Sequence, residues 1–336
     1  MVPSRTCAAN PAKAPLLSEP QQAHARVLII ENPEATEAYE PKEETVKAMM
    51  NTAITRFSGT TSIADSWKKL VSTQDIVGIK VCAGPGPKIG TRLVVVEAVV
   101  EGLLQAKLPA SNIVIWDKHE SDLRRSGFFS FVTRYGVRVQ GSAEAGYDEK
   151  AFYEFQILGQ LIWGDVEFGR SGEGVGKKSF VSKLLTKQLT KIIQITPLLN
   201  HNRAGVTGNL YSLVIGSVDN HIRFEMDPER LARAVPEIYA LPSLGDKVVL
   251  NIVDALVSQY QGEELSRLHY SNALNQLRLS TDPVALDFLS LQELDAQRKA
   301  AGIYLSNTNC LEIYSNAALL DLGVNDPGRI QVERIK

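Results

Sequence analysis

The chain has 336 residues, of which 44% are hydrophobic and 22% are charged. These are ordinary proportions for a folded globular protein with a sizeable core, which excludes a largely disordered chain. The formal net charge of −2 produces no strong field, so composition predicts neither a nucleic-acid partner nor a membrane partner. No apolar run reaches the roughly 18 residues that a membrane-spanning helix needs.

The cysteines and the start of the chain narrow the class further. Cys7, Cys82 and Cys310 are far apart and form no C-x-x-C pair, so we expect neither a disulfide framework nor an intrinsic iron–sulfur cluster. Residues 1–24 are rich in Ala, Pro and Ser and lack the apolar segment of a signal peptide, which predicts a flexible leader. We expect a soluble, cytoplasmic protein, or an exported, periplasmic one if the leader is the remnant of a removed signal.

Strands and helices are predicted to alternate from residue 25 onward. An apolar run over Ala25–Glu31 predicts a buried strand, and residues 41–54 predict a helix with one apolar face. Residues 75–82 and 112–117 predict two more strands, on either side of a helix over residues 91–107. A strand, a helix and a strand at this spacing form a crossover unit, which implies a parallel sheet.

The alternation is interrupted once. Residues 135–180 are irregular and rich in glycine, after which strands are predicted over residues 191–199 and 247–254. Helices are predicted over residues 182–189, 210–215 and 228–241, and after Asp282, a plausible cap. We therefore predict an α/β fold with a mixed, mostly parallel sheet, helices on both faces and an irregular Gly-rich middle segment. Residues 25–336 would form one domain, or two closely packed lobes that meet near residues 150–185.

A polar cluster follows the predicted strand over residues 191–199. Asn200, His201, Asn202 and Arg203 supply hydrogen-bond donors, acceptors and a titratable ring within four residues. Open α/β sheets bind their ligands beyond the carboxyl ends of their strands. We therefore predict a polar ligand site around residues 201–208, and the alternative is a hydrogen-bonded loop that only closes the sheet.

Further residues are assigned to the same site. Gly205 and Gly208 would let the main chain approach a ligand, and Thr207 and Asn220 would add polar side chains. Lys80 lies inside an apolar strand, where an unpaired ammonium is costly, so it needs a partner or a ligand.

Two aspartates compete as partners of Lys80. Asp117 and Asp254 each end a predicted strand, and the sequence leaves both open as the partner of Lys80. Asp254 is also predicted to orient or charge His201 from the same edge of the sheet.

Two glycine-rich stretches resemble nucleotide-binding loops only in part. Residues 84–90 lie between a strand and a helix, where an anion could bind, but Pro85 and Pro87 remove amide donors, which favours a rigid turn. Residues 169–179 lack a P-loop glycine at Ser171 and carry Lys178 where a hydroxyl residue is needed, which favours a surface loop.

Four blocks in order resemble the family known as domain of unknown function 362. They are residues 77–81 (VGIKV), 201–210 (HNRAGVTGNL) with 216–220 (GSVDN), 252–256 (IVDAL) and 280–287 (STDPVALD). Some relatives are fused to ferredoxin-like iron–sulfur domains and some carry twin-arginine export signals, so the resemblance implies a redox or exported context. Relatives often carry lysines where this chain has Leu199 and Tyr211.

Three hypotheses follow, and they leave open whether the protein is an enzyme. In the first, it acts on a small anionic ligand or cofactor, with His201 as acid/base, Arg203 as anion clamp and Asp254 as the orienting group. In the second, it is a non-catalytic accessory protein that carries a metal or cofactor. In the third, His201 and His221 bind a metal ion together with Asp219 or Asp254.

Overall fold

The structure is a computed structural model that describes residues 24–155, 177–303 and 311–336. Nearly all of the predicted leader, the second glycine-rich stretch up to residue 176, Cys7 and Cys310 lie outside the described residues.

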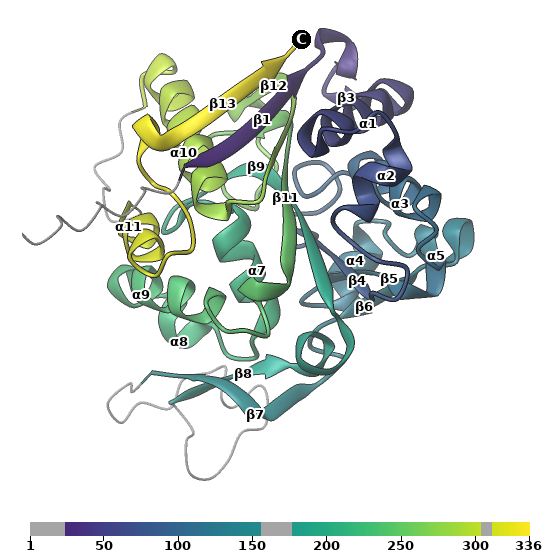
Figure 1. Ribbon diagram of the computed structural model, residues 1–336. Helices are drawn as coiled ribbons and strands as arrows, with labels where there is room; N and C mark the ends of the chain where they lie inside the picture. Colours follow the sequence, from purple (N-terminus) through teal and green to yellow (C-terminus); the bar gives the residue numbers. More distant parts are fainter. Residues whose placement is uncertain (1–23, 156–176, 304–310) are drawn as a thin grey trace, which may run out of the picture.

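The elements alternate along the chain, as the sequence predicts (Figure 1). The strands are β1 (Ala25–Glu31), β2 (Thr36–Glu37), β3 (Glu40–Pro41), β4 (Val77–Val81), β5 (Ile113–Asp117), β6 (Arg138–Gly141), β7 (Tyr147–Glu154), β8 (Lys178–Ser182), β9 (Lys191–His201), β10 (Gly205–Val206), β11 (Val248–Gln259), β12 (Ser271–Ser280) and β13 (Ile330–Ile335). The α-helices are α1 (Glu43–Ser58), α2 (Ile63–Lys68), α3 (Leu93–Gln105), α4 (Glu120–Arg125), α5 (Ser130–Tyr135), α7 (Asn209–Ser217), α8 (Ile222–Glu225), α9 (Pro228–Tyr239), α10 (Pro283–Ala300) and α11 (Leu311–Leu319).

The main sheet has the strand order β13-β1-β12-β11-β9-β4-β5-β6, with β10 paired to β9. Strands β11, β9, β4, β5 and β6 pair parallel with one another in that order. Strand β12 pairs antiparallel with both β11 and β1, so it alone runs against the others along this path. The predicted mixed, mostly parallel sheet is confirmed.

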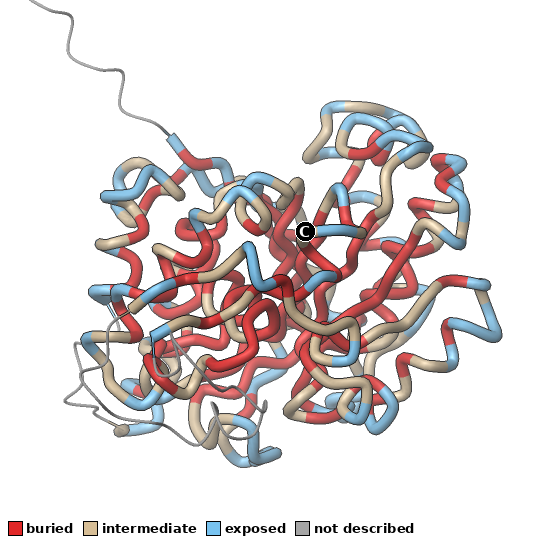
Figure 2. Tube along the Cα trace, turned by 90° about the horizontal axis from the view of Figure 1, so that it is seen from below, coloured by how far each residue is buried: buried red, intermediate tan, exposed pale blue. Residues whose placement is uncertain are grey.

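Helices cover both faces of this sheet, and each face has its own apolar core. On one face, α1, α2 and α3 bury Met50, Trp67 and Val99 against the strands. On the other face, α7, α9, α10 and α11 bury residues such as Leu213 and Val235. In Figure 2, most of the tube through the middle of the molecule is coloured as buried. Parallel strands covered in this way are apolar almost throughout, as β4 and β5 are.

The order of the strands reverses at one place in the sheet. From β4 the chain steps to β5 and then to β6 in one direction, whereas from β9 it steps to β11 in the other. Strands β4 and β9 are neighbours, and their carboxyl ends lie at the same edge. Such a reversal leaves a crevice outside the carboxyl ends of the strands, where open α/β folds place their ligands.

Some elements differ from the prediction. Residues 182–189, predicted as a helix, contain the end of β8 and a single π-helical turn over Leu184–Gln188. Part of the segment predicted to be irregular forms β6 and the β7–β8 ribbon. Strand β12 escaped prediction because charged Arg278 stands between Leu277 and Leu279, which are both buried. In the described ranges, no helix is both long and apolar enough to cross a membrane.

Candidate functional site

A pocket of about 230 Å³ lies at the point where the strand order reverses. Its floor and walls come from the carboxyl ends of β4, β5 and β9, from α7, and from His221 at the start of α8. Glu264, in the loop between β11 and β12, reaches the mouth of the pocket. Segments far apart in the sequence therefore meet here because their strands end at the same edge.

Lys80 lies on the floor of this pocket and is 1% exposed. Its ammonium donates hydrogen bonds to the Val81 carbonyl (2.7 Å), to the Asp117 carboxylate (2.9 Å) and to Ser212 Oγ (3.1 Å). An ammonium has three N–H donors, so all of them are used within the protein. The partner of Lys80 is thus Asp117 and not Asp254.

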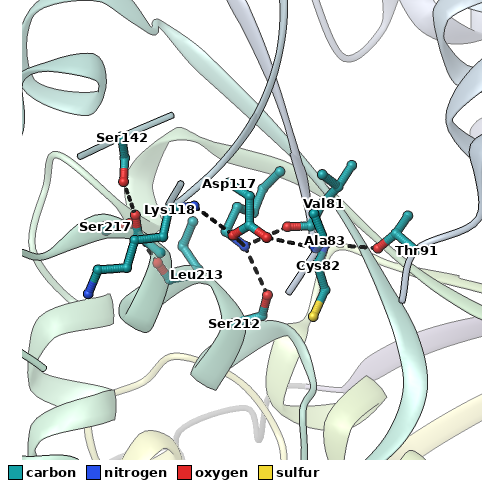
Figure 3. Close-up of polar contacts among 12 residues, drawn as sticks. Val81, Cys82, Ala83, Thr91, Asp117, Lys118, Ser142, Ser212, Leu213 and Ser217 are labelled. Carbon is teal, nitrogen blue, oxygen red and sulfur yellow. Dashed lines mark hydrogen bonds and ion pairs between the residues drawn. The ribbon is translucent and has the colours of Figure 1, made fainter. Parts of the chain in front are cut away.

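Asp117 is equally well satisfied. Besides Lys80, its carboxylate accepts hydrogen bonds from the main-chain N–H groups of Ala83 (2.7 Å) and Lys118 (2.8 Å). Figure 3 shows this carboxylate between Ala83 and Ser212, while the Lys118 side chain runs away from it. Lys80 and Asp117 form a closed ion pair that holds β4, β5 and α7 together.

Helix α7 approaches Lys80 closely because residue 216 is glycine. A Cβ atom at Gly216 would lie 2.4 Å from Lys80 Cε and 3.2 Å from Nζ. The close approach brings Tyr211 and Ser212, on the same helix, into the wall of the pocket.

His201 lines the pocket as a neutral hydrogen-bond donor. Its Nδ1 accepts a hydrogen bond from the Ala204 N–H (3.0 Å), so in the neutral ring the proton is on Nε2. Burial lowers the pKa of His201, and Arg203 adds to this effect, whereas Glu263 and Glu225 oppose it. Protonating Nδ1 would also break the bond from Ala204, so the ring resists becoming a cation.

The hairpin that carries His201 is tied to the loop between β11 and β12. The Asn200 side chain accepts from the Glu263 N–H (3.0 Å), and the Asn202 N–H donates to the Glu263 carboxylate (2.8 Å). Asn200 and Asn202, predicted to bind ligand, therefore hold two loops together and lie outside the pocket lining. Gly205, with φ +82°, begins β10 directly after the turn of the same hairpin.

The opposite wall holds a chain of hydrogen-bonded titratable groups. Lys118 Nζ donates to the Asp219 carbonyl (3.0 Å) and to Nδ1 of His221. His221 Nε2 donates to the Glu225 carboxylate (3.1 Å), and the Tyr211 hydroxyl donates to the same carboxylate. The Tyr211 ring in turn lies against His201, with ring centroids 4.3 Å apart.

Protonation states along this chain follow from its contacts. Burial would raise the pKa of Glu225, but hydrogen bonds from His221 and Tyr211 and the nearby His221 ring hold it at about 2. Burial and the Lys118 ammonium lower the pKa of His221. The series therefore joins a lysine, an imidazole that resists protonation and an anionic carboxylate.

Asp254 and Arg203, which were predicted to act together with His201, lie outside the pocket lining. Asp254 is fully buried and pairs with the Arg92 guanidinium (2.9 Å), and it also accepts the Arg92 main-chain N–H (3.1 Å). Asp254 therefore anchors the start of α3 through Arg92 instead of orienting His201. Arg203, predicted as the anion clamp, is outside the residues that line the pocket.

Glycine is needed at position 208 because the Asp287 carboxylate of the protein itself, and not a ligand, packs against it. A Cβ atom at Gly208, whose φ is +42°, would lie 2.6 Å from Asp287 Cγ. The Asp287 carboxylate accepts from the main-chain N–H groups of Asn209 (2.7 Å) and Leu210 (2.9 Å), so it occupies the amino end of α7. An outside anion cannot bind there.

The residues predicted to bind a metal do not converge. In the described part of the chain, no group of three or more His, Cys, Asp or Glu side chains is arranged to hold a metal ion. The Asp219 carboxylate accepts from the N–H groups of Phe180 (2.7 Å) and Asn220 (2.6 Å), and His221 is bonded to Lys118 and Glu225. Asn220, predicted to bind ligand, is buried outside the pocket lining.

The first glycine-rich stretch uses its amides internally, as expected of a rigid turn. Gly86 N–H donates to the Ala83 carbonyl, Gly90 N–H to the Gly86 carbonyl, and Thr91 N–H to the Cys82 carbonyl, each at 2.9 Å.

Of the predicted ligand residues, Lys80, His201, Thr207 and His221 line the pocket. Sequence reasoning missed the parts played by Lys118 and Tyr211, together with that of Glu225 behind the wall. Lys118 directly follows a predicted strand, and that position is the signal that could have identified it.

Comparison with known proteins places the chain in a family. The family described as Domain of unknown function (DUF362) matches residues 77–292, which is more than half of the sequence, and the chain belongs to this family. No curated protein matches the sequence.

One solved structure is similar in part. It is a structural-genomics crystal structure of a Thermotoga maritima protein, with 13% sequence identity and a TM-score of 0.43. The match covers 80% of this chain and 61% of that one.

Proposed function

We propose that this protein binds a small, singly charged anion in the pocket at the strand reversal, with His201 Nε2–H as a hydrogen-bond donor to it. The observation that carries this proposal is the convergence of three strand ends and α7 on one pocket, where a neutral histidine presents its only free donor position. Thr207 adds a hydroxyl to the same lining.

The charges around the pocket restrict the ligand further. Lys80 is neutralised by Asp117, and the lining also contains Lys118 together with two further acidic residues, Asp122 and Glu264. A doubly charged anion would be repelled by these carboxylates, whereas a monocarboxylate can accept hydrogen bonds from His201 without a large Coulomb cost. The proposal therefore favours small monocarboxylates over phosphate or sulfate.

His201 has a defined role in this proposal. Because its Nδ1 is already an acceptor, the ring donates a hydrogen bond and does not take up a proton. A neutral imidazole of this kind polarises an oxygen atom, as neutral histidine does in some isomerases. This changes the predicted role of His201 from acid/base to hydrogen-bond donor and leaves both a binding protein and an enzyme as outcomes.

A thermal-shift and calorimetric comparison tests the proposal. We expect acetate, pyruvate or glyoxylate to raise the melting temperature of the full chain by a few degrees at saturation, because a ligand at a hundred times its Kd adds about 2.7 kcal/mol. His201→Ala should weaken that binding about tenfold, since a lost hydrogen bond to a charged group costs about 1.5–3 kcal/mol.

Arg203→Ala is the matched control, because Arg203 is on the same hairpin but outside the pocket. It should weaken binding less than His201→Ala does, because only the charge of Arg203 acts on the site. Equal losses in the two variants, or tighter binding of sulfate than of every carboxylate, would contradict the proposal.

A further inference from the structure

We infer that Lys118, His221 and Glu225 form an amine-activating triad, and that Lys118 forms an imine with an aldehyde or ketone group of the ligand. The inference rests on the proposed function, because it assigns a carbonyl to the same small carboxylate. It goes beyond that function by naming a nucleophile, a base and an orienting group.

The geometry is that of an activated nucleophile. Lys118 lines the pocket from the end of β5, and its Nζ is hydrogen-bonded to Nδ1 of His221. The other ring nitrogen of His221 donates to the Glu225 carboxylate at 3.1 Å. A nucleophile bonded to a base, which a third group orients, is the arrangement that activates weak nucleophiles in many enzymes.

Glu225 is suited to the orienting role because of where it lies. It belongs to α8, and its side chain is 17% exposed. The hydroxyl of Tyr211 donates to its second oxygen, so the carboxylate cannot rotate away from His221 without losing two partners. Glu225 is thus a positioning residue, since it acts on the amine only through His221.

Lys80 lines the same pocket as Lys118, but its ammonium has different hydrogen-bond acceptors. Its three donors go to a carbonyl, a hydroxyl and the carboxylate of Asp117, and an ordinary carboxylate is a poor acceptor for an ammonium proton. Lys118 is hydrogen-bonded to the imidazole of His221, which is a stronger base than a carboxylate. Lys118 is therefore the amine that can lose a proton within the pocket.

The reaction balances with no further reagent. His221 Nδ1 takes a proton from the Lys118 ammonium, and Glu225 stabilises the resulting imidazolium. The amine lone pair then forms an N–C bond while the C=O pair moves onto oxygen, which the imidazolium protonates.

The resulting carbinolamine loses water. Nitrogen returns its second proton to His221, the imidazolium protonates the leaving hydroxyl, and a C=N bond forms. One amine and one carbonyl give one imine and one water, and His201 Nε2–H is available as donor to the carboxylate of the same ligand.

Reductive trapping of the imine tests this inference on the full-length protein. Glyoxylate and sodium cyanoborohydride at pH 7 convert an imine into a stable carboxymethyl amine, and peptide mass spectrometry locates it. Lys107, which is exposed, is the internal control. We expect Lys118 to be labelled at least about ten times faster than Lys107, since positioned bases accelerate proton transfer by about 10²–10⁴.

Variants separate activation from structure. Glu225→Gln removes the charge at similar size and should slow labelling of Lys118 about tenfold, while Glu225→Asp should restore part of the rate. Labelling of Lys107 should not change. A Lys118 rate no faster than that of Lys107, or one unaffected by Glu225→Gln, would overturn the inference.

The pH dependence of the labelling rate in the wild-type protein is a further test. In the described part of the chain, titratable groups near Lys118 include its sequence neighbours Asp117 and His119, Asp219, whose carbonyl accepts from it, and His221 backed by Glu225. If the triad activates the amine, labelling of Lys118 should reach half its maximum well below the ordinary lysine pKa of about 10.4, in contrast to Lys107. A profile shared by the two lysines would contradict activation.

Acetate distinguishes this inference from the proposed function, because it has the carboxylate but no reactive carbonyl. It should protect Lys118 and leave Lys107 reactive. Binding of acetate without fast labelling of Lys118 would refute the imine alone. Fast labelling that acetate does not slow would instead refute the carboxylate site.

Discussion

Lys80 lies on β4 and Lys118 directly follows the neighbouring parallel strand β5; both are buried and line the same pocket, yet their partners differ. Lys80 is enclosed by three acceptors that include an aspartate. Lys118 donates to a carbonyl and to an imidazole, which a glutamate holds from behind. The first arrangement neutralises a charge, whereas the second provides a path for a proton. Partner chemistry, more than burial, therefore separates a structural lysine from a reactive one.

The largest expected effect concerns the closed pair. Lys80→Met should destabilise the protein by about 3–5 kcal/mol, because it leaves the Asp117 carboxylate buried without its cation. Lys118→Met should cost less, about 1–3 kcal/mol, because it leaves a neutral imidazole and a carbonyl without a donor. Urea unfolding of both variants measures the difference, and equal losses would remove the contrast between the two lysines.

Asp287 extends the comparison to a buried carboxylate with only neutral hydrogen-bond donors around it. Burial raises its pKa from 3.8 to about 6, although hydrogen bonds from Asn209 and Leu210 oppose the rise. The folded state then binds a proton more readily than the unfolded state between these values. The free energy of unfolding should therefore rise, by at most about 3 kcal/mol from this group, as the pH falls from about 6 to 4.

Asp287→Asn should remove this contribution. Urea unfolding at pH 4.5 and pH 7 should show that the wild-type protein loses more stability than the variant as the pH increases. An identical pH dependence in the two proteins would mean that Asp287 does not titrate in this range.

The smallest of these effects concerns the helix that covers Lys80. Gly216→Ala places a methyl group 2.4 Å from Lys80 Cε, so α7 or the lysine must shift, at a cost of about 1–3 kcal/mol. Gly84→Ala is a matched control at the pocket mouth, where the nearest atom is Glu264 Oε1 at 3.8 Å. Thermal unfolding should show a loss for the first variant and little change for the second, and similar losses would argue against a tight contact at Gly216.

The sequence could predict the residues of this site that lie in strands or at their carboxyl ends. Lys80 and His201 lie in or at the end of apolar runs, and the carboxyl ends of parallel strands share one edge, so their convergence follows from the pattern. Asp254 and Gly208 were misjudged because their partners, Arg92 and Asp287, are distant in the chain.

Glu225 could not be predicted because nothing in the pattern places the short helix α8 behind the pocket wall. The family membership leaves the chemistry open, and the redox context that the resemblance implies stays a prediction.

The most direct test of the central claim is nitrogen-15 NMR of the histidine side chains during a titration with acetate. His201 should remain a neutral ring with its proton on Nε2 below pH 6.5, and acetate should shift that Nε2–H resonance with saturation. A His201 ring that becomes a cation near pH 6.5, or one that acetate leaves unchanged while it binds elsewhere, would contradict the assignment of this pocket as the ligand site.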